Sequence, residues 1–241
     1  HRLYRVLAAL STIPIVGGGL LTFSRGAGIS LVVLLLAMVA LRIVKPLHML
    51  LFTALLGLIV VVFVPDYGYR ISTVAELSQL TSGDVSEVEG SLRGRATENL
   101  AALNIFLANP ILGVGPGQTP LHTRAAGNEI GLRTLTTDRR AHNMYLEELA
   151  DTGAVGFAVF IGLVAYLVVR LWQIAKQAQR ARRNDIYFTM MGLMLAIIVY
   201  LSTAVFLHLS YVRYYWLLIA LSSAAVEIYG RHISSEQLTG R

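Results

Sequence analysis

Residues able to bind phosphate and to accept a proton lie in three short segments of this sequence. Arg25 lies in FSRGAG, and both Arg93 and Arg95 lie in SLRGR. His142 and Asn143 follow the first residue of AHNMYLEELADTG. A guanidinium binds phosphate oxygens through two parallel hydrogen bonds, and a neutral imidazole accepts a proton near pH 7. Taken one at a time, these residues are candidates for binding an anion or accepting a proton, and each also fits a structural role, such as an arginine that reaches the lipid headgroups.

A helix is predicted directly after the second segment. Four apolar residues recur there at helical spacing, namely Leu100, Leu103, Phe106 and Leu107. Asn109 and Pro110 end this helix, because a residue before proline is pushed out of the α region. Arg95 is therefore expected at the helix N-terminus, where unpaired backbone amides and a guanidinium together suit a phosphate group.

A second, short helix is predicted within the third segment. Asn143 suits its N-cap and Gly153 suits its C-terminal cap. Its apolar face consists of Tyr145, Leu146 and Leu149. The positive end of a helix disfavours the imidazolium form of a nearby histidine. We therefore expect His142 to be neutral and able to accept a proton near pH 7.

Between these two helices lies the glycine-rich segment NPILGVGPGQ, with Gly113, Gly115 and Gly117 at alternate positions. No strand precedes it, and its third glycine is misplaced for the dinucleotide fingerprint G-x-G-x-x-G. It also lacks the Gly-Lys-Ser/Thr of a phosphate-binding P-loop. We interpret it as a tight loop whose backbone can closely approach a neighbouring segment or a ligand.

Metal and cysteine chemistry have little support in the sequence. The chain has no cysteine, which excludes disulfides, thiolate metal sites and cysteine nucleophiles. Its six histidines are scattered without an H-x-x-x-H or H-E-x-x-H pair, and no D-x-D pattern occurs. The serine nucleophile elbow G-x-S-x-G is absent as well. We therefore expect no metal and no cofactor.

The composition is that of an integral membrane protein. Hydrophobic residues make up 55% of the 241 residues and charged residues only 14%, with a mean hydropathy of +0.63. A soluble protein carries about 25% charged residues to solvate its surface. Helices long enough to cross the hydrocarbon are predicted at about 4–23, 28–44, 47–64, 153–170, 187–207 and 212–230. The net charge of +6 mixes two sides of a membrane, and no nucleic-acid partner is expected.

These spans divide the chain into three parts: 1–64 with three helices, 65–152 as a polar loop subdomain, and 153–241 with three helices and a short tail. In short loops, Lys and Arg stay on the cytoplasmic side. The most basic connection follows the fourth span and carries Arg170, Lys176, Arg180, Arg182 and Arg183. Placing it in the cytoplasm puts Arg25, the long loop and Arg213 on the other side. We thus expect an all-α, polytopic helical membrane protein with one extracytoplasmic loop subdomain.

The order of these segments resembles the O-antigen ligases and related polymerases of bacterial envelopes. The resemblance covers about residues 20–230 and depends on Ser24-Arg25-Gly26, Gly94-Arg95, NPILGVGPGQ and AHNMYLEELADTG, in that order on one side of the membrane. Family members often carry a tryptophan where this chain has Asn99. They also usually have ten or more spans, so we expect this chain to be the C-terminal part of a longer protein.

The resemblance implies a glycosyltransferase C-type fold and a metal-independent transferase of the bacterial inner membrane, with its active site on the periplasmic face. Its donor would be an undecaprenyl-pyrophosphate-linked glycan, and its acceptor lipid A–core or another glycan. Arg25 and Arg95 would hold the pyrophosphate, and His142 would be the base on the acceptor hydroxyl, with inversion at the anomeric carbon. Further substrate-binding residues would be Arg93, Arg139, Arg140, Asn143 and Arg213.

Other interpretations stay open at this point. A polymerase would use the same residues to extend the glycan on a second lipid-linked repeat unit, and some relatives transfer to a protein hydroxyl. A polysaccharide or lipid transporter would use the arginines to bind anions, but it predicts charges within the spans and repeated halves. A purely structural subunit would explain the high hydrophobicity, but it gives no reason for the positions of the arginines and of His142.

Overall fold

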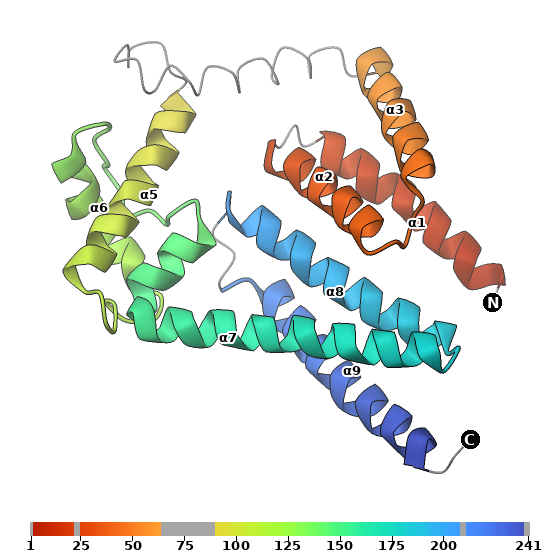
Figure 1. Cartoon of the computed structure of the whole chain (residues 1–241). Helices are drawn as coiled ribbons and strands as arrows, with labels where there is room; N and C mark the ends of the chain where they lie inside the picture. Colours follow the sequence, from red (N-terminus) through yellow and green to blue (C-terminus); the bar gives the residue numbers. More distant parts are fainter. Residues whose placement is uncertain (1, 22–24, 64–89, 208–210, 239–241) are drawn as a thin grey trace. The chain divides into compact units, whose positions relative to one another are not determined.

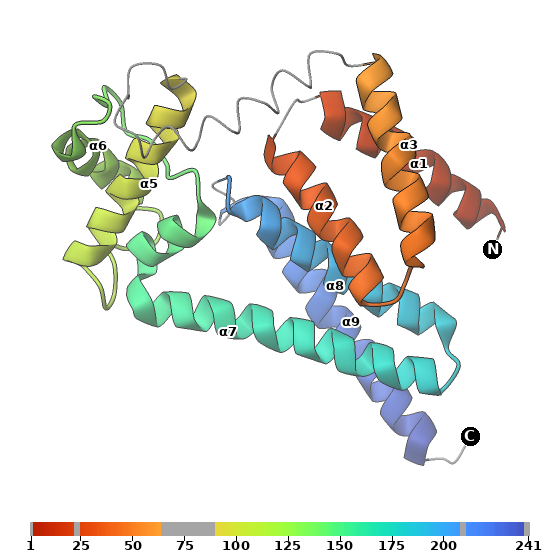
Figure 2. The ribbon, with the colours of Figure 1, turned by 45° about the horizontal axis from the view of Figure 1, so that its top comes forward.

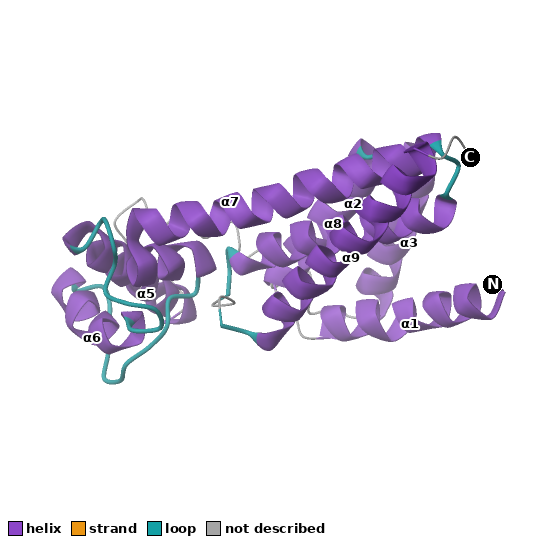
Figure 3. Ribbon diagram, turned by 90° about the horizontal axis from the view of Figure 1, so that it is seen from below, coloured by secondary structure: helices purple, strands orange, loops and turns teal. Residues whose placement is uncertain are grey.

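The computed structural model describes residues 2–21, 25–63, 90–207 and 211–238. Within these ranges the chain is helical and contains no strand (Figures 1 and 3). It forms two compact units, residues 1–88 and 89–241, and each is described by itself. The expected all-α class is confirmed for the described residues. Ser24 and the first part of the expected loop subdomain, 65–89, lie outside them.

In its described residues, the N-terminal unit has three helices: α1 (Arg2–Leu21), α2 (Arg25–Ala40) and α3 (Pro46–Phe63). They coincide with the first three predicted spans. Arg42 has a φ of 57° just beyond α2, and Pro46, with its fixed backbone angle, opens α3. The turn between the two helices is therefore short.

The C-terminal unit holds the site residues other than Arg25. Its helices are α5 (Gly90–Ala108), α6 (Thr119–Ile130), α7 (Met144–Arg180), α8 (Asn184–Ala204) and α9 (Arg213–Leu238). α5 and α6 pack together beside the start of α7, while the rest of α7 packs against α8 and α9 (Figure 2). The basic connection expected after the fourth span is itself helical as far as Arg180.

Two of the described helices, α7 and α8, are long and apolar enough to cross a membrane. Shorter apolar stretches occur at Gly26–Ala40 and Pro46–Leu55, so the remaining four spans stay predictions. α7 has 37 residues and is interrupted at Gly153. The continuous helix after the interruption, 154–180, is about 40 Å long at about 1.5 Å per residue, which exceeds the hydrocarbon thickness of about 30 Å. Glu147, Glu148 and Asp151 lie in its first turns. The stretch of α7 that is apolar enough to cross a membrane therefore follows Gly153.

α5 differs from its prediction in two ways, although it ends before Asn109 and Pro110 as expected. It begins at Gly90, so Arg95 lies in its second turn and the expectation of an N-terminal position was wrong. Its most buried positions are Thr97, Glu98, Ala101, Ala102 and Ile105. Leu100 and Leu107, from the predicted apolar face, are instead 40% and 63% exposed. Thr97, Ala101 and Ala102 make part of this face narrow, and α6 packs closely there: a Cβ on Gly127 of α6 would lie 3.3 Å from Cγ2 of Thr97.

Candidate functional site

The glycine-rich segment between α5 and α6 hydrogen-bonds to the backbone of α7. The amide of Val114 donates to the carbonyl of Ala150 at 2.9 Å, and the amide of Gly115 donates to that of Asp151 at 2.8 Å. This approach requires glycine at position 113, where φ is 67° and a Cβ would lie 2.5 Å from the carbonyl oxygen of Ala150. The prediction of a tight loop whose backbone closely approaches a neighbouring segment is confirmed.

α7 is interrupted at Gly153 and shares its hydrogen bonds with the same segment. Gly153 has φ 67° and ψ −169°, outside the helical region, and a Cβ there would overlap the carbonyl oxygen of Ile111. The amides of Ala154 and Val155 donate to the carbonyls of Pro110 and Ile111 at 2.8 and 3.2 Å. The short helix predicted to end at Gly153 does so, and these amides beyond the interruption remain paired.

Asp151 ties three parts of the C-terminal unit to α7. It is fully buried. Its Oδ1 accepts from the amide and the hydroxyl of Thr119, at 2.8 and 2.6 Å. Its Oδ2 accepts from the amide of Gly117 at 2.9 Å and from the hydroxyl of Tyr211 at 2.8 Å. Because Thr119 is the first residue of α6, the carboxylate also meets the positive end of that helix.

The segment between α6 and α7 carries His142 and is fixed at both ends. Oδ1 of Asn128 accepts from the amide of Leu135 at 2.7 Å, and Nδ2 donates to the carbonyl of the same residue at 3.3 Å. At the other end, Oδ1 of Asn143 accepts from the backbone amides two and three residues later, at 2.9 and 3.2 Å. The N-cap prediction for Asn143 is confirmed, and Ala141 is fully buried in the adjoining core.

His142 lies beside Glu98 of α5. Its Nε2 is 3.6 Å from Oε2 of Glu98, whose Oε1 is 3.2 Å from Nη1 of Arg139. The side chain of Glu98 is 2% exposed and that of His142 32%. Burial lowers the pKa of His142 below 6.5, the charge of Glu98 raises it, and those of Arg95 and Arg139 lower it. The lowered pKa of His142 agrees with the neutral imidazole expected at pH 7. Its main cause is burial of the side chain, whereas the sequence indicated the positive end of the following helix.

Arg140 contacts a second buried acid. Its Nη1 lies 3.4 Å from Oε1 of Glu147, which is fully buried, and its guanidinium carbon lies 5.5 Å from the ring centre of Tyr211. Burial raises the pKa of Glu147 to about 7, against the lowering effect of Arg140 and with a further increase from Asp151. Arg139 and Arg140 thus each pair with a carboxylate of the chain, yet their side chains stay 44% and 40% exposed.

Further cations gather at the start of α5. Arg95 is exposed, whereas Arg93 donates from Nη2 to the carbonyl of Leu132 at 2.9 Å. Between the two, Gly94 leaves room for Arg133, because a Cβ there would lie 2.6 Å from Nη1 of Arg133. Arg93, Leu132 and Arg133 also line a hollow of about 500 Å³. Arg133 was not part of any motif in the sequence, but it lies beside the predicted site residue Arg93.

The two remaining predicted residues open helices. Arg25 is the first residue of α2, in the N-terminal unit, so its participation in the site stays a prediction. Arg213 is exposed at the first position of α9, two residues after Tyr211, which contacts Arg140. The structure therefore groups His142 with Arg95, Arg139 and Glu98, and Glu98 is the member that the sequence motifs missed.

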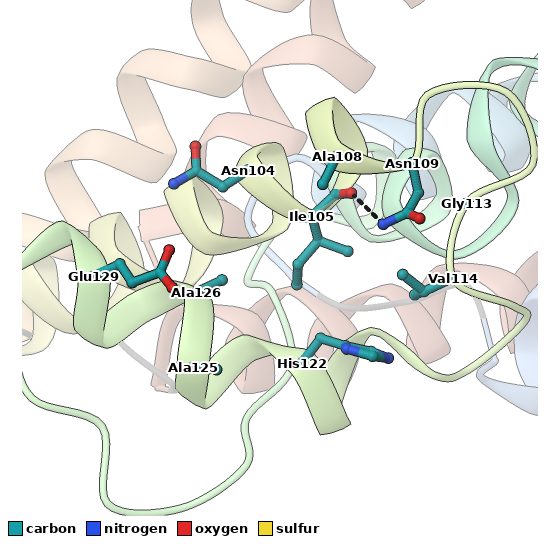
Figure 4. Close-up of a pocket in the computed structure, with 10 residues that line it drawn as sticks. All are labelled: Asn104, Ile105, Ala108, Asn109, Gly113, Val114, His122, Ala125, Ala126 and Glu129. Atoms are coloured by element: carbon teal, nitrogen blue, oxygen red, sulfur yellow. Dashed lines mark hydrogen bonds between the residues drawn. The ribbon is translucent and has the colours of Figure 1, made fainter.

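Figure 4 shows a further hollow, of about 540 Å³, between α5 and α6. Asn104 and Asn109 line it on the side of α5, and His122 and Glu129 line it on the side of α6. The side-chain amide of Asn109 donates to the carbonyl of Ile105 at 3.3 Å. The other polar side chains offer donors and acceptors of the kind that bind hydroxyl groups. Asn109, Gly113 and Val114 of the glycine-rich segment also line this hollow, whereas no motif pointed to Asn104, His122 or Glu129.

The described residues contain no group of three or more His, Cys, Asp or Glu side chains that could hold a metal ion. Around His142 the structure instead places one buried carboxylate and several guanidinium groups. Such a set suits an anionic ligand, because guanidinium groups carry fixed positive charge and only donate hydrogen bonds.

The described residues form a helical protein with two helices apolar enough to cross a membrane and with a cluster of arginines around His142, just before α7. A family model described as O-antigen ligase matches residues 10–161, and the chain belongs to this family. The family consists of membrane-associated, glycosyltransferase-like ligases and polymerases. No curated protein matches the chain.

Proposed function

We propose that this chain is part of a metal-independent glycan transferase that moves an undecaprenyl-pyrophosphate-linked polysaccharide onto lipid A–core. The proposed location is the bacterial inner membrane, with the site on the periplasmic face. The observation that carries the proposal is the placement of His142. Its lowered pKa favours a neutral imidazole at pH 7, and the buried carboxylate of Glu98 lies 3.6 Å from its Nε2.

His142 acts as general base in the proposed reaction. It takes the proton of the acceptor hydroxyl while that oxygen attacks the anomeric carbon of the donor sugar. The new carbon–oxygen bond forms on one face as the bond to the pyrophosphate oxygen breaks on the other, so the anomeric configuration inverts. The imidazolium that results is stabilised by the negative charge of Glu98, whose Oε2 lies 3.6 Å from Nε2 of His142.

Arginines take the place of a metal in this proposal. The departing undecaprenyl pyrophosphate carries the developing negative charge, which fixed cations stabilise best where water is excluded. Arg25 and Arg95 hold the pyrophosphate, and Arg93, Arg139, Arg140 and Arg213 are further substrate-binding residues. The exposure of Arg95 supports this role, as do the exposed portions of Arg139 and Arg140 beside their carboxylate partners.

Asn143 has a positioning role in this proposal. It caps the helix that follows His142 and so holds the segment that carries the histidine.

A histidine substitution in the full-length protein tests the proposal. His142→Ala is expressed in a strain deleted for its own copy, surface polysaccharide is compared on gels, and protein in the membrane is quantified. His48→Ala is the control, because His48 is an exposed histidine near the start of α3 and is not among the proposed site residues. We expect His142→Ala to lower transfer by about 10²- to 10⁴-fold, the usual contribution of a general base, and His48→Ala to leave it unchanged.

The gel pattern also separates the alternatives. Lipid-linked glycan and unattached polymer accumulate when a ligase fails, whereas single repeat units on the core accumulate when a polymerase that uses the same residues fails. Failure of a transporter would leave the donor on the cytoplasmic side. Wild-type transfer by a normally inserted His142→Ala variant would refute the general-base role.

A further inference from the structure

We propose that a corner of the C-terminal unit, made of Leu107, Pro110, Ile111 and Leu112, inserts into the lipid layer around the membrane-crossing part of α7. The corner comprises the last turn of α5 and the start of the glycine-rich segment. The inference concerns how the unit sits on the membrane, and it holds whichever acceptor the site uses.

Hydrogen bonds place the corner beside the beginning of the span. The carbonyls of Pro110 and Ile111 accept from the amides of Ala154 and Val155, which form the first turn after the interruption of α7. Val155 is itself 52% exposed, as expected for an apolar side chain that faces lipid. The last turn of α5 lies beside the start of the long straight part of α7 (Figures 1 and 2). Because the two segments share these bonds, we place the corner at the depth where the span begins.

The side chains of the corner are apolar and open. Leu107, Ile111 and Leu112 are 63%, 67% and 72% exposed. No Asp, Glu, Lys or Arg occurs between Glu98 and Arg124, although a water-facing segment of that length normally carries several charges. A contiguous exposed apolar patch marks a binding surface for protein or lipid, and its continuity with the span selects lipid.

The backbone of the corner suits this surrounding. Non-helical backbone is tolerated at membrane depth only where its polar groups have partners. Proline at position 110 has no amide hydrogen, the carbonyls of Pro110 and Ile111 are bonded to α7, and the amide of Gly113 donates to the carbonyl of Asn109 at 3.0 Å. The corner therefore presents apolar side chains while these backbone groups are bonded within the protein.

Insertion of the corner would fix the height of the site above the membrane. The same segment continues into Val114 and Gly115, which hold the first part of α7, and into Gly117, which donates to Asp151. Since that part of α7 begins just after His142, the corner and the histidine move together. A headgroup or lipid-linked phosphate at the membrane surface would then meet the arginines at a defined level.

Site-directed spin labelling tests the insertion, and the absence of native cysteine gives it a clean background. Leu112→Cys in the full chain is labelled with a nitroxide and reconstituted into vesicles of phosphatidylethanolamine and phosphatidylglycerol. Collision rates are measured with oxygen, which concentrates in lipid, and with a water-soluble nickel chelate. Val159→Cys, at a residue of α7 that is 68% exposed, is the lipid control. Thr136→Cys, on the exposed α6–α7 segment, is the water control.

The label at Leu112 is expected to collide with oxygen and not with the nickel chelate, as at Val159. Collisions with the chelate at the rate seen for Thr136 would place the corner in water and overturn the proposal. Protection from both reagents would mean that another protein surface covers it, which overturns the proposal as well. Ile111→Cys repeats the measurement at a second exposed position, and circular dichroism confirms that each labelled chain keeps its helix content.

Discussion

Glu98 connects two of the predicted site residues, since one of its oxygens lies 3.2 Å from Arg139 and the other 3.6 Å from His142. A buried carboxylate of this kind is costly unless it is paired. Here the partners are the two side chains that the proposed reaction needs. The sequence did not single out Glu98, because one acid in a helix has no motif and its partners lie about forty residues later in the chain.

We predict that Glu98→Gln shifts the pH dependence of transfer. Glu98 raises the pKa of His142, so its neutralisation lowers that pKa further and moves the acidic limb of the rate profile to lower pH. The rate at the plateau should fall about tenfold or more, because the imidazolium loses its carboxylate partner. Transfer rates of the full-length protein between pH 5 and 8 check both effects. A slower variant with an unshifted acidic limb would assign Glu98 a structural role only.

Glu147 gives a prediction about stability. Its folded pKa of about 7 exceeds the ordinary value of 4.5, so the folded state keeps a proton that the unfolded state releases. Its contribution to stability is present below about pH 4.5 and is lost as pH rises through about 7. Glu147→Gln should therefore become more stable relative to the wild type as pH rises, by at most a few kcal/mol, since one pKa unit corresponds to about 1.4 kcal/mol.

Thermal unfolding of the purified protein in detergent at pH 5, 6 and 8 measures this difference. Arg140 stays in place in both proteins, which makes the comparison a test of the buried carboxyl. A difference that is the same at all three pH values would contradict the prediction.

At the level of elements, the hydrogen bonds between the glycine-rich segment and α7 mark where the polar first part of α7 ends and its apolar stretch begins. The sequence indicated both participants, through NPILGVGPGQ and through Gly153. It could not show that they meet, because that contact depends on the fold. Likewise, the apolar positions Tyr145, Leu146 and Leu149 are only half-buried, while the acids Glu147 and Asp151 are buried completely.

Gly153→Ala is predicted to destabilise the protein by about 3 kcal/mol, because it combines a left-handed backbone with a steric overlap. Gly162→Ala is the matched control in the same helix, where a Cβ would meet nothing within 4 Å. It should leave stability unchanged or slightly raised, since alanine favours the helix over glycine. Unfolding midpoints of both variants in detergent check this, and equal midpoints would mean that the interruption at Gly153 is not required.

At the level of the whole molecule, each of the six predicted spans coincides with a described helix, because apolar length is a local property of the chain. Two of them meet the length and hydropathy expected of a span in the described residues. The division at 1–64, 65–152 and 153–241 stays a prediction, and the structure groups 89–241 as one unit. Local sequence pattern also identified His142 and, next to it, Asn143 as the N-cap of the following helix. The first residue of α5 and the carboxylate partners of the arginines depend on tertiary packing, which no local pattern encodes.

Labelling of single cysteines tests the predicted sidedness. Thr136→Cys lies on the α6–α7 segment, and Ala181→Cys lies just after α7, both at exposed positions. In intact spheroplasts, a membrane-impermeant maleimide should label Thr136→Cys. It should label Ala181→Cys only after the membrane is broken. Labelling of Ala181→Cys alone would place the arginines and His142 in the cytoplasm, where the proposed transfer could not occur.

The hydrogen bonds that cross from the glycine-rich segment to α7 also bear on how the protein is made. The carbonyls of Pro110 and Ile111 leave the ribosome before the amides of Ala154 and Val155 that they bind. When the apolar part of α7 reaches the translocation machinery, the partner of its first turn has therefore already been synthesised. A chain begun after Leu112 would lack both carbonyls and leave these two amides without their partners. We therefore expect such a chain to insert this helix less efficiently, because unpaired backbone groups are costly in lipid.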